Sequence, residues 1–494
     1  MPDSFLLYPI SYWVVLLVLI GGACWCVQYF KEGVGIPMLA VLGTIAVWYA
    51  GDAYYNGYAR YTQMFDADVL ASAWWEVAWF LVVFLVATPF VHRWFNARWA
   101  RRPSGILQLV QSGVEVPVLQ RQLDQLLYLC VVAYAVIVVV AVIRLRGQIP
   151  YFFFPFLGYK AEPWGRDRIG SGFDALLTLA FYVQLMMTAA FGVVAAVSTR
   201  RLTRWLAMGL CLLSWPYFIF DRTRNTILVV VIPAILGWVF LRLRGGTWRK
   251  VLLLAAFFLV INAWMAFIIA NRSSTGVVTA LREDKFNLTK DSEVHHQGLN
   301  MFEELCWINT FIKDGSYVPN WGARYFAEAV NPIPRALWHG KPLIGIDYAI
   351  ARGQRVRGTG GGRQAGVYAT ISTGMVGQGV VNFGGILGPA AAALLMSLWA
   401  AILARQDLNI WSFGRLPLYA FGLILTFNLG RDITLITLYP FVFLAAFVWW
   451  WDRRNRRHPA PAAPAAPPPR QRRPPSPNAA RQRRPQRPRK FPSA

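Results

Sequence analysis

The sequence is poor in cysteine and histidine, with only five of each among its 494 residues. Four of the cysteines lie inside apolar runs, where a cysteine usually acts as a small buried hydrophobe, and Cys306 stands alone. Neither a disulfide framework nor the ligand spacing of a metal site is present. The adjacent His295 and His296 would point apart on a helix, and no acidic triad surrounds them. We therefore expect no bound metal and no cofactor.

Acidic residues are also scarce: 24 Asp and Glu stand against 49 Lys and Arg, which gives a formal charge of +25. The C-terminal segment 452–494 holds thirteen Lys and Arg against one acid, and so supplies about half of that excess. Because this segment is rich in Pro, Ala and Arg, it cannot build a core, and we expect it to be disordered. A basic tail tethered to a membrane is expected to lie on anionic lipid headgroups rather than on nucleic acid.

Two further absences narrow the class of protein. No glycine-rich phosphate loop is present on the predicted cytoplasmic side, which leaves ATP and nucleotide-sugar chemistry without support. The alternating pattern of barrel strands is missing too, whereas apolar runs of about 18–25 residues recur along most of the chain. The sequence therefore predicts an all-α, polytopic membrane protein, with a helix bundle over 1–451 and the basic tail after it.

The apolar runs predict eleven transmembrane helices. Their ranges are 11–30, 36–51, 71–91, 123–143, 173–197, 205–220, 226–241, 251–270, 383–403, 416–430 and 433–451. Clusters of arginine or lysine follow the third, fifth, seventh and eleventh of these, all on one side of the membrane. By the positive-inside rule, the N-terminus is predicted outside and the C-terminus in the cytoplasm.

Several arginines oppose this rule because they lie at the predicted outer ends of helices. The stretch "FDRTRN" places Arg222 and Arg224 between two apolar runs, and Arg272 and Arg431 occupy similar positions. Because the positive-inside rule disfavours arginine on the outer side of the membrane, arginines placed there suggest that they hold an anion. The alternative is that each arginine snorkels to the phosphate headgroups of the bilayer.

The predicted large outer loop covers 271–367. Within it, "NMFEELCWINTFI" at 300–312 has apolar residues at helical spacing, with Glu303 and Glu304 near its start. This pattern predicts a short amphipathic helix that lies at the membrane surface or on the bundle.

Two other stretches of the same loop carry cations. In "NPIPRALWHGKP", prolines fix the backbone around Arg335, His339 and Lys341, which lowers the entropy cost of holding these side chains in place. In "ARGQRVRGTGGGRQAG", glycines accompany Arg352, Arg355 and two further arginines. This second stretch is expected to close over an anionic ligand as a lid. The alternative is a disordered connector.

The stretch "GQGVVNFGGILG" leads into the ninth predicted span. Its glycines allow helices to approach closely or the backbone to bend. Gln378 and Asn382 are four residues apart, so on a helix they share a face, which we expect to point into protein rather than lipid.

Taken in order, "FDRTRN", "NPIPRALWHGKP", "GQGVVNFGGILG" and "NLGRDITLITLYPF" resemble stretches of the bacterial oligosaccharide repeat-unit polymerases, the O-antigen polymerase family. The eleven-span layout with one large outer loop late in the chain is also similar. The resemblance covers roughly Trp215 to Phe441. One position departs from the pattern, because Gln378 stands where a glutamate is expected.

The resemblance implies a glycosyltransferase in the bacterial inner membrane. Such an enzyme transfers a growing glycan from undecaprenyl diphosphate to a fresh lipid-linked repeat unit at the outer face, and a chain-length regulator is an implied partner. Arginine suits a metal-free diphosphate site because its planar fork pairs two oxygens at once and stays charged. The residues expected to bind the diphosphates are Arg222, Arg224, Arg272, Arg335, Lys341, Arg352, Arg355 and Arg431, with Gln378 and Asn382 in support.

Attack by a sugar hydroxyl needs a proton acceptor. The candidates are Asp432, Glu304 and His339. Asp432 follows Arg431 directly, and a carboxylate paired with arginine is a poor base because its pKa falls.

Two other functions stay open at this stage. An O-antigen ligase uses the same donor but a lipid A core as acceptor. A transporter of an anionic lipid-linked sugar would use the arginines as a binding path, although the sequence shows neither an internal repeat nor charges at mid-helix depth.

Overall fold

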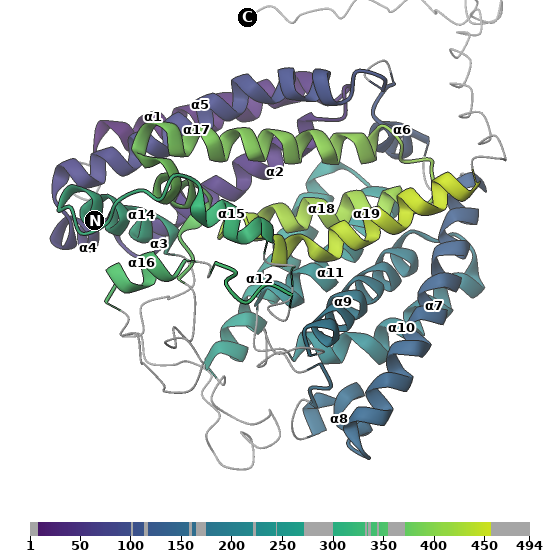
Figure 1. Ribbon diagram of the computed structural model, residues 1–494. Helices are drawn as coiled ribbons and strands as arrows, with labels where there is room; N and C mark the ends of the chain where they lie inside the picture. The colour runs from purple at the N-terminus through teal and green to yellow at the C-terminus, as the bar shows by residue number, and fades with distance from the viewer. Residues whose placement is uncertain are drawn as a thin grey trace, which may run out of the picture. The chain divides into compact units, whose positions relative to one another are not determined.

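Figure 1 shows a computed structural model of the chain. It describes residues 8–99, 102–112, 117–157, 161–164, 174–220, 224–243, 245–270, 300–330, 333, 337–342, 345–353 and 371–455. Over these ranges all regular secondary structure is helical, which confirms the predicted all-α class.

The first half of the chain is built from long helices joined by short ones. They are α1 (Ile10–Cys26), α2 (Gly35–Ile45) continued by a π-helical turn into α3 (Gly51–Tyr55), α4 (Tyr58–Met64), α5 (Ala67–Phe95), α6 (Gly105–Ser112), α7 (Pro117–Leu145), α8 (Ile149–Phe153), α9 (Asp174–Val197), α10 (Arg201–Ile219), α11 (Arg224–Gly237) and α12 (Thr247–Ala270).

The second half places three short helices between the long ones. They are α14 (Met301–Lys313), α15 (Ala323–Val330) and α16 (Ile346–Ala351), followed by α17 (Gly374–Asp407), α18 (Arg415–Leu429) and α19 (Leu435–Asn455). The predicted amphipathic helix at 300–312 is confirmed as α14, which packs against α5 and α17.

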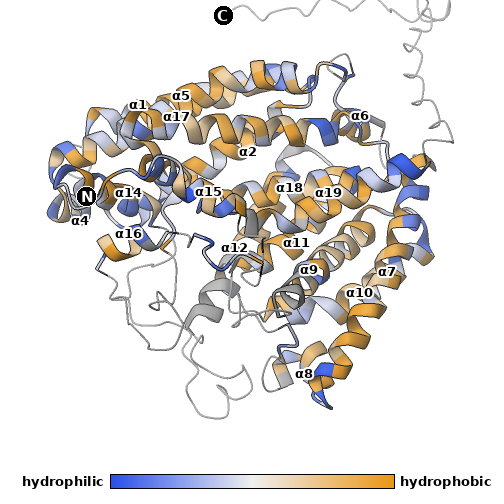
Figure 2. Ribbon diagram, in the orientation of Figure 1, coloured by the Kyte–Doolittle hydropathy of each residue, from blue (hydrophilic) through white to orange (hydrophobic). Residues whose placement is uncertain are grey.

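Among the described residues, six helical segments are long and apolar enough to cross a membrane: Ile10–Tyr29, Gly35–Tyr55, Ala67–Phe95, Pro117–Leu145, Ala180–Val197 and Gly374–Asp407. Thr226–Arg242 and Arg415–Leu429 are shorter apolar helices. Figure 2 shows hydrophobic residues along the lengths of α7 and α17. The chain therefore has the helices of a multi-pass membrane protein, as the sequence predicts.

One end of the bundle is rich in arginine, and we call it the basic end. Here Arg102 donates to Asn409 Oδ1 over 3.1 Å, the backbone N–H of Ile106 donates to Asp407 Oδ1 over 2.7 Å, and Arg415 pairs with Asp452. These contacts join α6 and the segment before it to the C-terminal end of α17, and the start of α18 to the end of α19. The predicted tail begins at 452, but α19 continues to Asn455, and 456–494 lie outside the described residues.

The other end carries α14, α15, α16 and the turn at 430–434, and we call it the α14 end. Asp52 fixes α14 there, because its buried carboxylate accepts the backbone N–H of Phe302 over 2.7 Å and the hydroxyl of Tyr61 over 2.8 Å. A carboxylate at a helix N-terminus satisfies free amides and opposes the positive end of the helix dipole. The ring of Phe302 also stacks on Trp74, with centroids 4.0 Å apart.

The helix α17 folds back on itself near its start. Gly384 has φ +79°, outside helical values, and a Cβ on Gly379 would overlap the carbonyl oxygen of Gly388. Residues nine apart in a continuous helix are separated by about 13 Å along its axis. The predicted span at 383–403 therefore begins at this fold, and the residues before it form a separate short helix at the α14 end.

Candidate functional site

The N-terminus of α17 meets the turn between α18 and α19 at the α14 end. The amide of Gly374 donates to the carbonyl of Arg431 over 2.9 Å, and the amide of Met375 donates to the carbonyl of Gly430 over 3.0 Å. Gly374 has φ +75°, and a Cβ there would overlap the hydroxyl of Tyr49. Only glycine fits this position without strain, so the local sequence holds the turn tightly against α17.

Gln378 and Asn382 extend this contact. The side chain of Gln378 binds the backbone of Ile433 twice, accepting its N–H over 2.7 Å and donating to its carbonyl over 3.2 Å. Asn382 donates to the carbonyl of Gln378 over 2.7 Å and accepts the amide of Tyr325 over 3.3 Å. Both side chains are buried and point into protein. They position the 430–434 turn and α15.

Asp432 is the first acid of the site. Its Oδ1 accepts the amide of Thr373 over 3.3 Å, the hydroxyl of Thr373 over 3.2 Å and Nη2 of Arg324 over 3.3 Å. Its partner is therefore Arg324 and not the adjacent Arg431, whose exposed guanidinium donates to Ser372 Oγ over 2.8 Å. Burial raises the pKa of Asp432 and the charge of Arg324 opposes that rise, so the predicted fall in pKa is wrong.

Arg324 is the residue that the sequence analysis missed. Its side chain is only 2% exposed, and Nη2 reaches both Asp432 and the carbonyl of Ile371. Its Nε and Nη1 are buried and have no hydrogen-bond partner within the part of the chain that the structure describes. A buried cation with two open donors is costly unless an anion or another acceptor meets it.

The burial of Arg324 follows from an unusual amphipathic pattern. In α15 the buried face carries Arg324, Ala327 and Glu328, whereas Phe326 is 55% exposed. Glu328 accepts a hydrogen bond from the Thr434 hydroxyl over 2.7 Å, so the buried face lies on the 430–434 turn. The sequence signal for this burial was the i, i+4 spacing of Arg324 and Glu328, with the outward-facing Phe326 between them.

A second cluster of the α14 end holds Glu304. Its Oε2 accepts the Tyr348 hydroxyl over 2.6 Å and Nε of Arg352 over 3.3 Å, and its Oε1 accepts Nη2 of Arg352 over 3.1 Å. The guanidinium of Arg352 also lies 4.4 Å from the centroid of the Trp307 ring. The carboxylate of Glu304, a predicted proton acceptor, is therefore bound by Arg352 and Tyr348, and its role as a base stays a prediction.

The helix α16 connects the two clusters. Its N-cap residue Gly345 has φ +63°, and a Cβ there would lie 3.3 Å from Cζ of Arg324. Two residues later, in the first turn of α16, Asp347 accepts the Tyr317 hydroxyl over 2.7 Å and the Asn320 amide over 2.9 Å. Burial raises the pKa of Asp347, but these hydrogen bonds outweigh it and hold the pKa below its usual value. The carboxylate is thus a second fixed negative charge near Arg324.

The remaining predicted cations do not join these clusters or are not described. His339 is exposed in a turn, and Lys341 donates to the carbonyl of Ile333 over 3.0 Å. Arg224 opens α11, but its side chain is not described. Arg222, Arg272, Arg335 and Arg355 lie outside the described residues.

The site offers hydrogen-bond and charge chemistry. No group of three His, Cys, Asp or Glu in the described ranges could hold a metal ion. Arg324, Arg431 and Arg352 supply fixed cations, and Asp432 supplies a carboxylate with a raised pKa. Such a set can bind an anion and accept a proton beside it.

No family model, curated protein or solved structure matches this chain.

Proposed function

We propose that the chain is a membrane glycosyltransferase that polymerises oligosaccharide repeat units carried on undecaprenyl diphosphate. The observation that carries the proposal is the buried guanidinium of Arg324, with two donors open and Asp432 bound to a third nitrogen. A diphosphate oxygen is the acceptor that such a guanidinium would pair with best.

The reaction has a defined electron balance. An acceptor hydroxyl attacks the anomeric carbon of the donor glycan, and the bond from that carbon to the diphosphate oxygen breaks. The electron pair leaves with the diphosphate, where Arg324 and Arg431 offset the developing charge. The proton of the hydroxyl passes to Asp432, whose side chain remains 16% exposed and within reach of a substrate.

The topology of the proposal keeps all eleven predicted spans. Besides the six long candidates, α10, α11, α12, α18 and α19 would cross the membrane, with the α14 end outside and the basic end in the cytoplasm of a bacterial inner membrane. Support comes from the basic end, which gathers Arg93, Arg98 and Arg102 beside Arg405 and Arg415, as the positive-inside rule requires of a cytoplasmic face.

The test is a reconstitution of the purified chain into vesicles. The substrate is the undecaprenyl-diphosphate repeat unit extracted from a source strain that lacks this protein. A polymerase produces a ladder of lipid-linked products whose masses differ by one repeat. Transfer that requires an added lipid A core would instead identify a ligase, and movement of the substrate between leaflets without bond formation would identify a transporter.

The same vesicles test the site. Arg324→Lys keeps the charge but loses the planar fork, so the ladder is expected to form about 10²-fold more slowly while the protein level holds. Arg60→Lys is the matched control, because Arg60 pairs with Glu303 over 3.7 Å at the same end and is 30% exposed. If Arg324→Lys and Arg60→Lys produced ladders at equal rates, the result would contradict the assignment of Arg324 to the site.

A further inference from the structure

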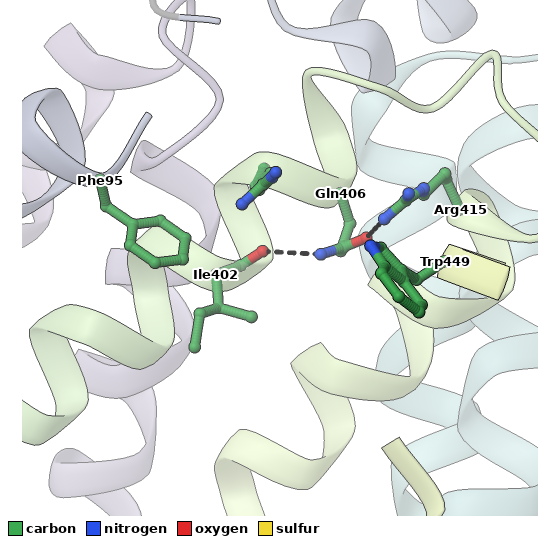
Figure 3. Close-up of a pocket in the computed structure, with 6 residues that line it drawn as sticks. Phe95, Ile402, Gln406, Arg415 and Trp449 are labelled. Atoms are coloured by element: carbon green, nitrogen blue, oxygen red, sulfur yellow. Dashed lines mark hydrogen bonds between the residues drawn. The ribbon is translucent and has the colours of Figure 1, made fainter. Parts of the chain in front are cut away.

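The basic end contains a cavity that the proposed reaction does not use. Its volume is ≈ 260 Å³, and α5, α17, α18 and α19 surround it. It is lined by Phe95, Ile402, Arg405, Gln406, Arg415 and Trp449 (Figure 3). A neighbouring cavity of ≈ 280 Å³ shares Phe95 and Arg405 with it and adds Arg98 from the turn after α5.

Arg415 is fixed on one wall of the first cavity. Its Nη1 donates to Gln406 Oε1 over 2.6 Å, and its Nη2 pairs with Asp452. Gln406 is itself held by a bond to the carbonyl of Ile402 over 3.1 Å (Figure 3). The Nε of Arg415 is buried and has no hydrogen-bond partner among the described residues. One guanidinium of the cavity is thus pre-oriented.

Arg405 is the second cation. It is exposed, its Cζ lies 5.7 Å from the centroid of the Phe95 ring, and in the described part of the chain its guanidinium forms neither a hydrogen bond nor an ion pair. Arg405, Arg415 and Arg98 line the two cavities, and the described residues that line them include no acid, although Asp452 pairs with Arg415. Like charges held this close repel unless an anion lies between them.

The surroundings indicate that this anion belongs to a lipid. Trp94 is 78% exposed, Trp449 is 55% exposed and Trp450 is 46% exposed. Tryptophan gathers where the bilayer meets water, because its ring is apolar and its N–H is polar. The cavities therefore lie at the depth of phospholipid phosphates, and basic pockets between helices at this depth suit anionic headgroups.

We propose that these cavities form a binding site for the phosphate group of an anionic phospholipid, with Arg405 as the main ligand and Arg415 as its fixed neighbour. The guanidinium of Arg405 pairs with two phosphate oxygens, and the acyl chains leave along the exposed side of α5 beside Trp94. This site lies at the opposite end of the bundle from Arg324 and serves lipid association, independently of the polymerase reaction.

The experiment uses the full-length chain, purified and stripped of lipid in detergent. Native mass spectrometry counts the molecules bound during titration with phosphatidylglycerol, phosphatidylcholine or inorganic phosphate. The unaltered protein is expected to bind phosphatidylglycerol at least about 10-fold more tightly than phosphatidylcholine, since only the former carries net negative charge. Equal binding of the two lipids would overturn the proposal.

Variants locate the site. Arg405→Gln should weaken phosphatidylglycerol binding about 10-fold, and Arg405→Lys should weaken it less because it keeps the charge. Arg201→Gln, which removes an exposed charge at the start of α10, is the control and should change binding less than about 2-fold.

Equal losses for Arg405→Gln and Arg201→Gln would show a diffuse charge effect and overturn the site. Binding of inorganic phosphate that depends on Arg405, without binding of phosphatidylglycerol, would overturn the lipid as its source. If Arg405→Gln aggregates, Arg405→Lys and the lipid selectivity of the unaltered protein decide the question.

Discussion

The two ends of the bundle both hold arginine, but they hold it in different ways. At the basic end Arg405 is exposed over Phe95, and Arg415 is fixed by Gln406 and Asp452. At the α14 end Arg324 is 2% exposed and tied to Asp432. When a charged side chain is buried, each hydrogen bond that it forms is stronger, and each donor or acceptor left without a partner costs more free energy. The two ends therefore differ in how far water screens their charges, which is more at exposed Arg405 than at buried Arg324.

The largest effect should come from the acid that Arg324 binds. Asp432→Asn removes the proposed proton acceptor but keeps the size of the side chain, so we expect ladder formation to slow by about 10²- to 10⁴-fold. The measurement is the initial rate of ladder formation in vesicles.

The matched control for this change is Asp66→Asn. Asp66 is an acid of the same end that pairs with Lys313 over 2.9 Å and is 73% exposed. Because exposed ion pairs contribute little, the control should keep its rate within about 2-fold. A rate for Asp432→Asn as high as that of the control would remove Asp432 from the reaction and leave it a structural role.

The second prediction concerns the cation. Arg324→Lys should lower the rate by about 10²-fold, because one donor of a preorganised anion site is typically worth that much. At the basic end Arg405→Lys should leave the rate unchanged, since Arg405 lies outside the α14 end. The difference in rate between these two conservative variants measures directly what burial adds. Similar losses for both would mean that total positive charge matters and that the two ends are not distinct.

Packing gives a third way to test the comparison. Gly374→Ala places a Cβ on the hydroxyl of Tyr49 and keeps a φ of +75° that only glycine tolerates well. We expect it to lower the free energy of unfolding by about 2–4 kcal/mol. Thermal unfolding in detergent, followed by size-exclusion chromatography, measures the change.

The control for Gly374→Ala is Gly43→Ala in α2, where no atom lies within 4 Å of an added Cβ. A glycine-to-alanine change inside a helix stabilises it by about 0.5–1 kcal/mol, so this variant should unfold at the same temperature or higher. If both variants unfold alike, the turn at 430–434 is not held as tightly as its hydrogen bonds indicate.

The pH dependence of the rate of ladder formation tests the electrostatics of the α14 end. The proton acceptor must be ionised, so activity should rise with pH as Asp432 loses its proton. Burial raises the pKa of Asp432, which moves this acid limb above the usual aspartate range, and Arg324 and Arg431 are the charged groups that oppose the rise. Arg324→Gln removes the stronger of the two, so the residual activity should show an acid limb at higher pH.

The check on that prediction is the direction of the shift in the pH–rate profile. Arg60→Gln, at the same end, should leave the limb in place because Arg60 pairs with Glu303. A limb that moves to lower pH in Arg324→Gln would mean that the titrating group is not Asp432.

Much of the fold was predictable because long apolar runs have few alternatives in a membrane. The helix at 300–312 was predictable because its apolar residues recur at helical spacing within one short stretch of sequence. The fold of α17 at Gly384 was not, because a glycine-rich stretch predicts close packing and bending equally well. The pairs of the site were missed because Arg324 and Asp432 lie 108 residues apart and Glu304 and Arg352 lie 48 apart. No local pattern encodes such pairing.

The smallest effect is expected for His339, which the sequence offers as a proton acceptor beside Asp432. Its side chain is exposed in a turn, whereas Asp432, Thr373 and Arg324 are joined by hydrogen bonds. We therefore expect His339→Ala to change the rate of ladder formation by less than about 2-fold, as surface substitutions usually do. A loss above about 10-fold would show that the turn reaches the site during the reaction. The contrast between exposed and buried groups would then describe the resting protein and not the working one.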